Sequence, residues 1–174
     1  MALNFRLATA IDAARLNALV NSVYRGESSK VGWTTEAELL GGQRTDAEGL
    51  TTLINTSDHA ILLAEEAGAL VGCVHLSKKN LDTCYLGMLS VQAELQSRGT
   101  GRELLAAGEA FAKTQWRCTR VEMTVIGQRP ELIDYYVRRG YRSSGERRAF
   151  PMDDPRFGIP KRKDLYFKVL LKDL

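Results

Sequence analysis

The sequence predicts one α/β domain, an α+β mixed sheet that is mostly antiparallel and carries helices on both faces. The 174 residues, 44% of them apolar, suit a single domain with a normal core. Runs rich in β-formers at 60–65, 70–76 and 84–91, with a tight hairpin at 66–69, are typical of an antiparallel meander. A glycine loop, a helical pattern and a strand at 121–125 follow, which indicates a βαβ-like crossover.

The amino-terminal part is expected to hold one strand and three helices. Apolar and polar residues alternate at 5–7, as in a short strand. Thr9 and Asp12 have the spacing of a capping box and precede an amphipathic helix. Two more boxes, at 35–38 and 45–48, lie in a polar, turn-rich segment and predict short helices.

The carboxy-terminal part is expected to add a helix and two strands. Pro130 suits a first helical turn, and Gly140 suits the left-handed cap that ends the helix. Strands are expected near 142–146 and at 165–171, separated by a loop with three prolines. Since no repeat, low-complexity tract or linker divides the chain, we expect residues 1–174 to form a single domain.

The composition limits the classes of binding partner and the cellular compartment that we expect. The net charge is only +3, with 24 basic against 21 acidic residues, so we expect no nucleic-acid partner. Three scattered cysteines without a C-x-x-C pair favour free thiols in a reducing compartment. Without a long apolar run or signal peptide, the protein is expected to be cytoplasmic, with no membrane and no metal. The oligomeric state stays open, a homodimer included.

A glycine loop at residues 96–101 has the features of an anion site. Gly99 and Gly101 allow the backbone to aim several N–H groups into one concavity, and the following helix adds its positive end. Arg98 and Arg102 add guanidinium groups that can grip phosphate oxygens. The alternative is a plain glycine turn that caps a surface helix.

Two familiar phosphate motifs fit this loop poorly. A Walker loop needs a lysine and a hydroxyl residue after its last glycine, whereas Arg-Glu-Leu follows Gly101. A dinucleotide fingerprint needs a third glycine or small residue where Leu104 stands. Glu122 does lie about where a ribose-binding acid would be, so a Rossmann-like nucleotide-binding domain remains an alternative.

The loop and two flanking motifs together resemble the GCN5-related N-acetyltransferases (GNAT), which use acetyl-CoA. The motifs are the strand end Leu89-Ser-Val91, the loop Gln96-x-x-Gly99-x-Gly101 and the later Tyr136-x-x-x-Gly140-Tyr141. The resemblance runs from about residue 5 to residue 172. It implies a bulged strand that splays from the next central strand at the cofactor cleft, where pantetheine lies like an added strand.

The resemblance also implies roles for individual residues. The backbone of Leu89 would face the acetyl carbonyl, and Val91 would face pantetheine. Tyr136 would be the general acid that protonates the leaving thiolate, although it could instead simply pack on its helix. Tyr135 points about 100° away around the helix and is the weaker candidate. The pyrophosphate would be surrounded by Gln96, Arg98, Gly99, Thr100, Gly101 and Arg102.

The sequence lacks the general base expected from the resemblance. Many GNAT relatives carry a glutamate on the strand before the loop. Residues 83–91 contain none. His75 is the tentative base because its unperturbed pKa lies near neutrality, but a lone strand histidine is often merely packed. Glu27, Glu65, Glu66 and a chain of waters are the alternatives.

The acceptor is expected to bind between two loops rich in arginine and aromatic residues, 24–45 and 146–163. Arginine there could clamp an acidic group, so we prefer a small primary amine with an acidic group over a polyamine. A solvated charged rim is the alternative, and Trp33 could equally be a helix staple. The tentative substrate residues are Tyr24, Arg25, Trp33 and Arg148.

The resemblance therefore predicts an acyltransferase that moves an acetyl group from acetyl-CoA directly to an amine in a ternary complex. A non-catalytic acyl-CoA sensor, suggested by the missing strand glutamate, is the alternative from another class.

Overall fold

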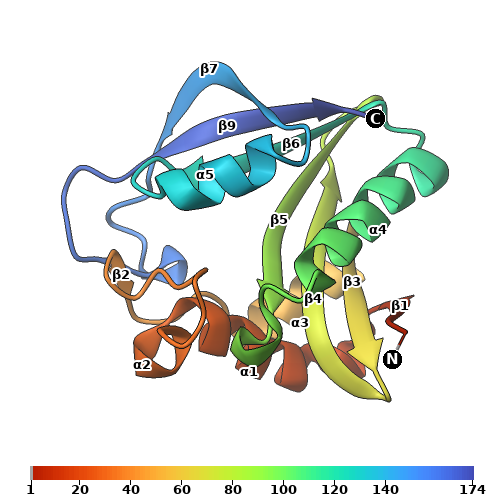
Figure 1. Cartoon of the computed structure of the whole chain (residues 1–174), viewed down its shortest axis with the longest axis horizontal. Helices are drawn as coiled ribbons and strands as arrows, with labels where there is room; N and C mark the ends of the chain where they lie inside the picture. Colours follow the sequence, from red (N-terminus) through yellow and green to blue (C-terminus); the bar gives the residue numbers. More distant parts are fainter. Residues whose placement is uncertain (1) are drawn as a thin grey trace.

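Seven strands form the central sheet of the computed structural model, which describes residues 2–174 (Figure 1). Their order is β1-β3-β4-β5-β6-β9-β7, and all neighbours are antiparallel except the parallel pair β5 and β6. The predicted fold class is thus confirmed, and the topology contradicts the Rossmann-like alternative, which needs a mainly parallel sheet. The strands are β1 (Asn4–Leu7), β3 (His59–Glu66), β4 (Ala69–Lys78), β5 (Thr83–Val91), β6 (Arg120–Ile126), β7 (Arg142–Ala149) and β9 (Tyr166–Asp173).

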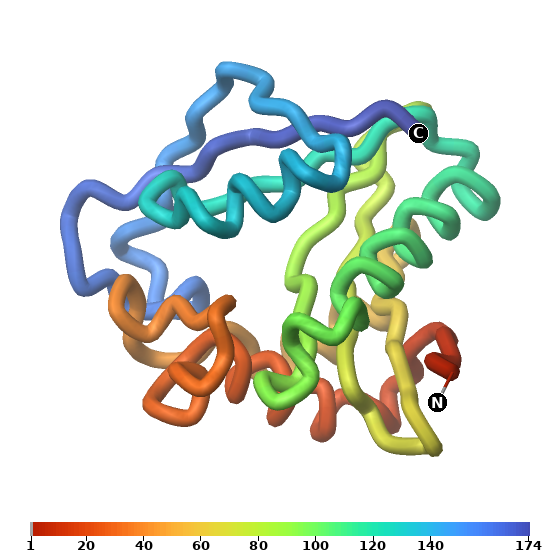
Figure 2. Tube along the Cα trace, viewed as in Figure 1, coloured from red at the N-terminus to blue at the C-terminus, as the bar shows by residue number. Residues whose placement is uncertain are grey.

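Helices cover both faces of this sheet, as the trace in Figure 2 also shows. Helices α1 (Ala13–Tyr24) and α3 (Ala47–Asn55) pack on one face, and α4 (Thr100–Gln115) and α5 (Pro130–Val137) pack on the other. The remaining elements are a short helix α2 (Gly26–Ser29), a two-stranded ribbon of β2 (Leu40–Gly41) and β8 (Ile159–Pro160), and 3₁₀ turns at Ala10–Asp12, Ala93–Leu95 and Pro155–Phe157. No helix among residues 2–174 is both long and apolar enough to cross a membrane.

Burial on both faces explains why the sequences of the central strands are nearly continuous runs of apolar residues. Along β3, Leu62 and Ala64 join the core under α4, whereas Ile61 and Leu63 join the core under α1 and α3. Successive strand residues point to opposite faces, so a strand covered on both sides needs apolar residues throughout.

The predicted amino-terminal helices are only partly found. The capping box of Thr9 and Asp12 is present, and α1 follows it. The helix expected after Thr35 is a single turn, in which Leu40 N–H donates to the Glu36 carbonyl at 2.9 Å. It stops there because Leu40 pairs with β8 instead of continuing the helix.

Helix α3 begins one residue later than its capping pattern suggested. Asp46, not Thr45, is the cap, and its carboxylate accepts a hydrogen bond of 2.6 Å from Gly49 N–H. Both residue types can cap, and the sequence spacing does not distinguish them.

Strands β5 and β6 pair over a short stretch and then diverge (Figure 1). Their register covers only Thr83–Tyr85 against Arg120–Glu122. Beyond it, the β4 pairing of β5 shifts by one residue, and Met88 adopts a φ of 54°. An extra residue of this kind bends and twists its strand. The bulge and the splay that the resemblance implied are therefore present.

Candidate active site

The amino terminus of α4 faces the gap between the diverging strands. Gly99 has a φ of 92°, which favours glycine, and it lies at the cap of the 16-residue helix. A Cβ on Gly101 would lie only 2.9 Å from the Tyr135 hydroxyl. The first-turn N–H groups of a helix have no intrahelical acceptor and carry the positive end of its dipole. This end of α4 can therefore receive an anion at close range.

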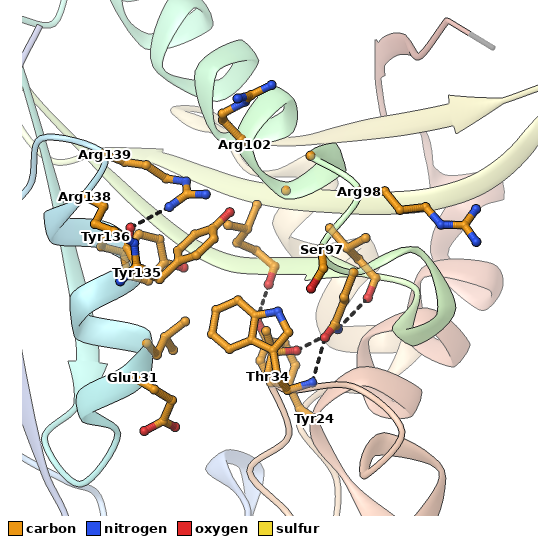
Figure 3. A pocket seen from close by; sticks show the side chains of 17 residues that line it. Tyr24, Thr34, Ser97, Arg98, Arg102, Glu131, Tyr135, Tyr136, Arg138 and Arg139 are labelled. Atoms are coloured by element: carbon orange, nitrogen blue, oxygen red, sulfur yellow. Dashed lines mark hydrogen bonds between the residues drawn. The ribbon is translucent and has the colours of Figure 1, made fainter.

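A cleft of about 760 Å³ begins at this helix end (Figure 3). It follows the open edge of β5 at Leu89 and Val91 and is closed on the other side by α5. Its lining contains Tyr24, Trp33, Thr34, Leu89, Val91, Gln96, Ser97, Arg98, Gly99, Gly101, Arg102, Glu131, Leu132, Tyr135, Tyr136, Arg138 and Arg139.

Arginines make the helix end of the cleft positive. Arg102, in the first turn of α4, and Arg139, just after α5, both line the cleft, and the Arg98 guanidinium extends away from the other two (Figure 3). Arg139 donates to the Tyr135 carbonyl at 2.8 Å, and its guanidinium carbon lies 3.4 Å from the centre of the Tyr135 ring. The ring and the carbonyl hold this guanidinium in place beside the α4 amides.

Gln96 ties the segment after α2 to the end of β5. Its amide nitrogen donates to Val91 O at 3.0 Å and to Thr34 Oγ1 at 2.9 Å, and its amide oxygen accepts from Trp33 N–H at 2.9 Å. Trp33 then reaches across the cleft to Tyr135, with ring centres 5.1 Å apart. The Gln96 side chain is thus occupied by contacts within the protein, and Trp33 lines the cleft.

A second, smaller cavity of about 210 Å³, here called the side cavity, adjoins the cleft. Tyr24, Leu89, Leu132 and Tyr136 line both. The Tyr24 hydroxyl donates to the Leu89 carbonyl by a short hydrogen bond. The junction of the two cavities therefore consists of two phenols, one leucine side chain and the bulged part of β5.

Burial keeps both junction phenols protonated. It raises the pKa of Tyr24 to about 12, and it raises that of Tyr136 well above its ordinary value. Arg129 opposes both shifts slightly, so its positive charge acts on both hydroxyls. Each phenol can donate a hydrogen bond throughout the physiological pH range.

Charged groups gather in the side cavity. Arg25 and Arg129 are 5% and 3% exposed, and both approach Glu36. Arg25 Nη1 donates to Glu36 Oε2 at 2.6 Å, while Arg129 Nη1 lies 3.4 Å from Glu36 Oε1. Arg44 also lines the cavity, with its guanidinium 5.9 Å from the centre of the Tyr24 ring. Most of the remaining wall is apolar, from Leu40, Met88, Met123, Phe150, Phe157 and Phe167 among others.

Three expected site residues lie outside both cavities: Thr100, which is buried at the start of α4, His75 and Arg148. His75 stacks on His59, with their ring nitrogens 3.0 Å apart, and burial lowers its pKa to about 4. Nothing in this position supports the role of a base. Arg148 donates to Glu122 at 2.8 Å and to Glu146 at 2.8 Å, so its guanidinium is occupied on the sheet and is not part of the acceptor side.

The other carboxylates considered as bases are also absent from both linings. Glu65 pairs with Arg6 and Arg15, and Glu27 pairs with Lys30 at the surface. Glu66 belongs to neither cavity. Of the expected residues, the structure brings Leu89, Val91, Tyr136 and most of the glycine loop into the cleft, and it brings Tyr24 and Arg25 into the side cavity.

The sequence did not predict a site role for three charged residues that line the side cavity: Glu36, Arg44 and Arg129. Glu36 lies inside the capping pattern of Thr35 and Glu38, and Arg129 directly precedes the helix-starting Pro130, so neither position indicates a binding role. Arg44 belongs to an arginine-rich loop, which was the one available signal.

The splayed strands leave an open strand edge beside a helix terminus, an arrangement that can receive a ligand as an added strand. Residues 24–145, more than half of the chain, match the family model of the acetyltransferase (GNAT) family. The chain therefore belongs to the GNAT acetyltransferases and is an acyltransferase. A search of curated proteins found no match.

Solved structures of acetyltransferases share this fold. A GNAT-family acetyltransferase from Streptococcus pneumoniae is 18% identical with a TM-score of 0.70, covering 99% of this chain and 100% of that one. yncA, a putative acetyltransferase from Salmonella typhimurium solved with acetyl-CoA, is 16% identical with a TM-score of 0.71, covering 100% and 95%. A variant of the spermidine N-acetyltransferase SpeG from Vibrio cholerae is 14% identical with a TM-score of 0.70, covering 98% and 93%.

Proposed function

We propose that this acetyltransferase moves the acetyl group of acetyl-CoA directly to the primary amine of a small molecule, within a ternary complex. The observation that carries the proposal is the continuous lining from the α4 amino terminus, along the open edge of β5, to Tyr136. The acetyl-CoA bound by the similar Salmonella protein supports the choice of acyl donor. The adjoining side cavity then supplies a separate place for the amine.

The cleft residues fit coenzyme A by their chemistry. The amides around Gly99 and Gly101, together with Arg102 and Arg139, suit the pyrophosphate. The open edge of β5 at Leu89 and Val91 suits the two amides of the pantetheine arm, which can bond like an added strand. Acetyl-CoA would supply the activated thioester.

Tyr136 is the proposed proton donor. Attack forms a bond from the amine nitrogen to the acetyl carbon while the carbon–sulfur bond breaks, so the sulfur gains an electron pair. The Tyr136 hydroxyl, which stays protonated at neutral pH, can donate to that sulfur. The proton that the amine loses is assigned to water, because His75, Glu27, Glu65 and Glu66 lie outside both cavities and the two glutamates that line them, Glu36 and Glu131, contact arginines. Holding amine and thioester in line supplies the rest of the rate enhancement.

Replacing Tyr136 by phenylalanine tests the assignment. We expect Tyr136→Phe to lower kcat by about 100-fold, the usual range for a lost general acid, while the acetyl-CoA Kd stays within about twofold. Thiol release measures turnover, and titration calorimetry measures binding. Tyr135→Phe is the matched control, because its ring contacts with Trp33 and Arg139 do not need the hydroxyl. Equal losses in the two variants, or none, would remove Tyr136 from this role.

A further inference from the structure

The side cavity holds more positive charge than its own carboxylate balances. Among the described residues that line it, three are arginines, Arg25, Arg44 and Arg129, and one is acidic, Glu36. Glu36 is shared by Arg25 and Arg129, which leaves a formal excess of two positive charges. Buried charges are normally paired, so an imbalance in a ligand-sized cavity indicates a missing anion.

The three guanidiniums are not equally free. Arg25 is fixed, because Nη1 donates to Glu36 at 2.6 Å and Nη2 donates to the Phe157 carbonyl at 3.2 Å. Arg129 has long contacts with Glu36 at 3.4 Å and with Glu131, outside the side cavity, at 4.0 Å, and its buried Nη2 has no partner among the described residues. Arg44 has a ring contact with Tyr24 and forms no ion pair with a carboxylate among residues 2–174. Buried donors are almost always bonded, so the Arg129 Nη2 group requires a partner from elsewhere.

We propose that the side cavity binds an acceptor amine that also carries a carboxylate, held by Arg129 and Arg44. This inference rests on the proposed N-acetyltransferase function and names its substrate class. A carboxylate matches the planar donor fork of arginine. Arg129 lines the same cavity as Tyr24 and Tyr136, so the carboxylate and the amine at the junction are separated by a short spacer.

The rest of the cavity restricts the acceptor further. Its volume, about 210 Å³, is below the roughly 300 to 1,000 Å³ of pockets that hold drug-sized ligands. Phe150, Phe157 and Phe167 add apolar surface to the same lining. A small amino acid with an apolar side chain fits both properties. A polyamine does not, because the cavity would place its cations beside unbalanced guanidiniums.

The excess charge also serves the chemistry of the amine. An amine attacks only in its neutral form, and nearby cations disfavour its ammonium form. Arg129 and Arg44 would therefore hold one end of the acceptor and ease loss of a proton at the other.

Matched acid and amide acceptors test the proposal with the full-length protein. Glycine, methionine and phenylalanine are each compared with their carboxamides, and spermidine is added as a polycation. We expect kcat/KM, followed by thiol release, to favour the best acid over its own amide by roughly 10- to 100-fold, as for a hydrogen-bonded charge pair. Arg129→Gln should bring that ratio close to one. If Arg129→Gln folds poorly, Arg44→Gln replaces it, because Arg44 is only half-buried. This variant should also lower the acid-to-amide ratio of kcat/KM.

Arg142→Gln is the matched control, because Arg142 is exposed on β7 and pairs with Asp173 outside both cavities. It should keep the wild-type ratio. Equal rates for every acid and its amide, or a preference for spermidine, would overturn the carboxylate proposal and leave the N-acetyltransferase function standing.

If no amine releases thiol although acetyl-CoA binds, the proposed function fails instead. Binding then decides the carboxylate question separately. N-acetylmethionine and its amide are titrated into the protein with coenzyme A, and a preference for the acid that disappears in Arg129→Gln supports the proposal. Equal affinities would refute it.

Discussion

The cleft and the side cavity meet at Tyr24 and Tyr136 but are built in different ways. The cleft takes its shape mainly from backbone: a bulged strand, a helix end and glycines that leave room. The side cavity takes its character from side chains, above all the arginines around Glu36. A backbone site tolerates changes in most side chains, whereas a side-chain site can be altered by single substitutions. Under the proposed function, the donor therefore has a place fixed by backbone and the acceptor has an adaptable one.

The largest expected effect tests whether the cleft depends on backbone space. In Gly101→Leu, the new side chain would meet the Tyr135 hydroxyl and fill the region beside the α4 amides. We expect acetyl-CoA to bind about 100-fold more weakly, the upper range for overpacking. Titration calorimetry measures the Kd, and circular dichroism confirms the fold.

Ala106→Leu provides the matched control, because Ala106 lies on the exposed side of the same helix. It should bind acetyl-CoA like the unaltered protein. Unchanged affinity in Gly101→Leu would show that the helix end is not where the donor binds.

A smaller effect on kcat is expected at the junction of the cleft and the side cavity. Tyr24→Phe removes the hydroxyl that donates to the Leu89 carbonyl, and the ring stays. Since a single hydrogen bond contributes about 1 kcal/mol net, we expect kcat to fall about fivefold. Steady-state kinetics with both substrates varied would show the change in kcat. Tyr166→Phe, on β9 outside both cavities, should leave kcat unaltered, and an equal loss there would argue against a junction role for Tyr24.

The same contrast explains what the sequence could predict. The cleft residues lie in local motifs, such as Gly99 and Gly101 before α4, whose spacing follows from helix and turn geometry. Such motifs can be identified without knowing the fold. The central strands were likewise predicted close to their observed bounds, because each is a short apolar run bounded by turn residues. The helical spacing of apolar residues located α4 and α5.

The side cavity could not be predicted in this way. Arg129 and Glu36 are 93 positions apart, and only the tertiary fold brings them together. Arg148 belongs to an arginine-rich loop in the sequence, yet strand pairing turns it to Glu122 on the sheet. Residue type indicated that arginines gather in the loops around residues 24–45 and 146–163, but it could not select which of them face the side cavity.

The smallest effect on turnover is expected at His75, which lies outside both cavities. Its folded-state pKa of about 4 lies below the ordinary value of 6.5, mainly through burial and then through the charges of His59 and Arg44. As pH falls below 6.5, His75 becomes protonated in the unfolded chain but stays neutral in the folded protein. The free energy of unfolding therefore declines until about pH 4. The loss reaches at most about 3 kcal/mol. Asp12 and Glu65, whose pKa values are lowered by Arg6, begin to lose their contribution only as pH falls to their ordinary values of 3.8 and 4.5, at the acid end of this window or below it.

His75→Gln should therefore flatten the decline in the free energy of unfolding between pH 6.5 and pH 4, measured by urea titration, because glutamine does not titrate. Turnover of the variant at pH 7.5 should stay within about twofold of wild type, since no lining of the cleft or the side cavity includes this residue. A tenfold loss of kcat in a variant that folds normally would instead restore His75 as the base. It would also mean that the reacting amine reaches beyond the two cavities, across the bulge of β5 toward β4.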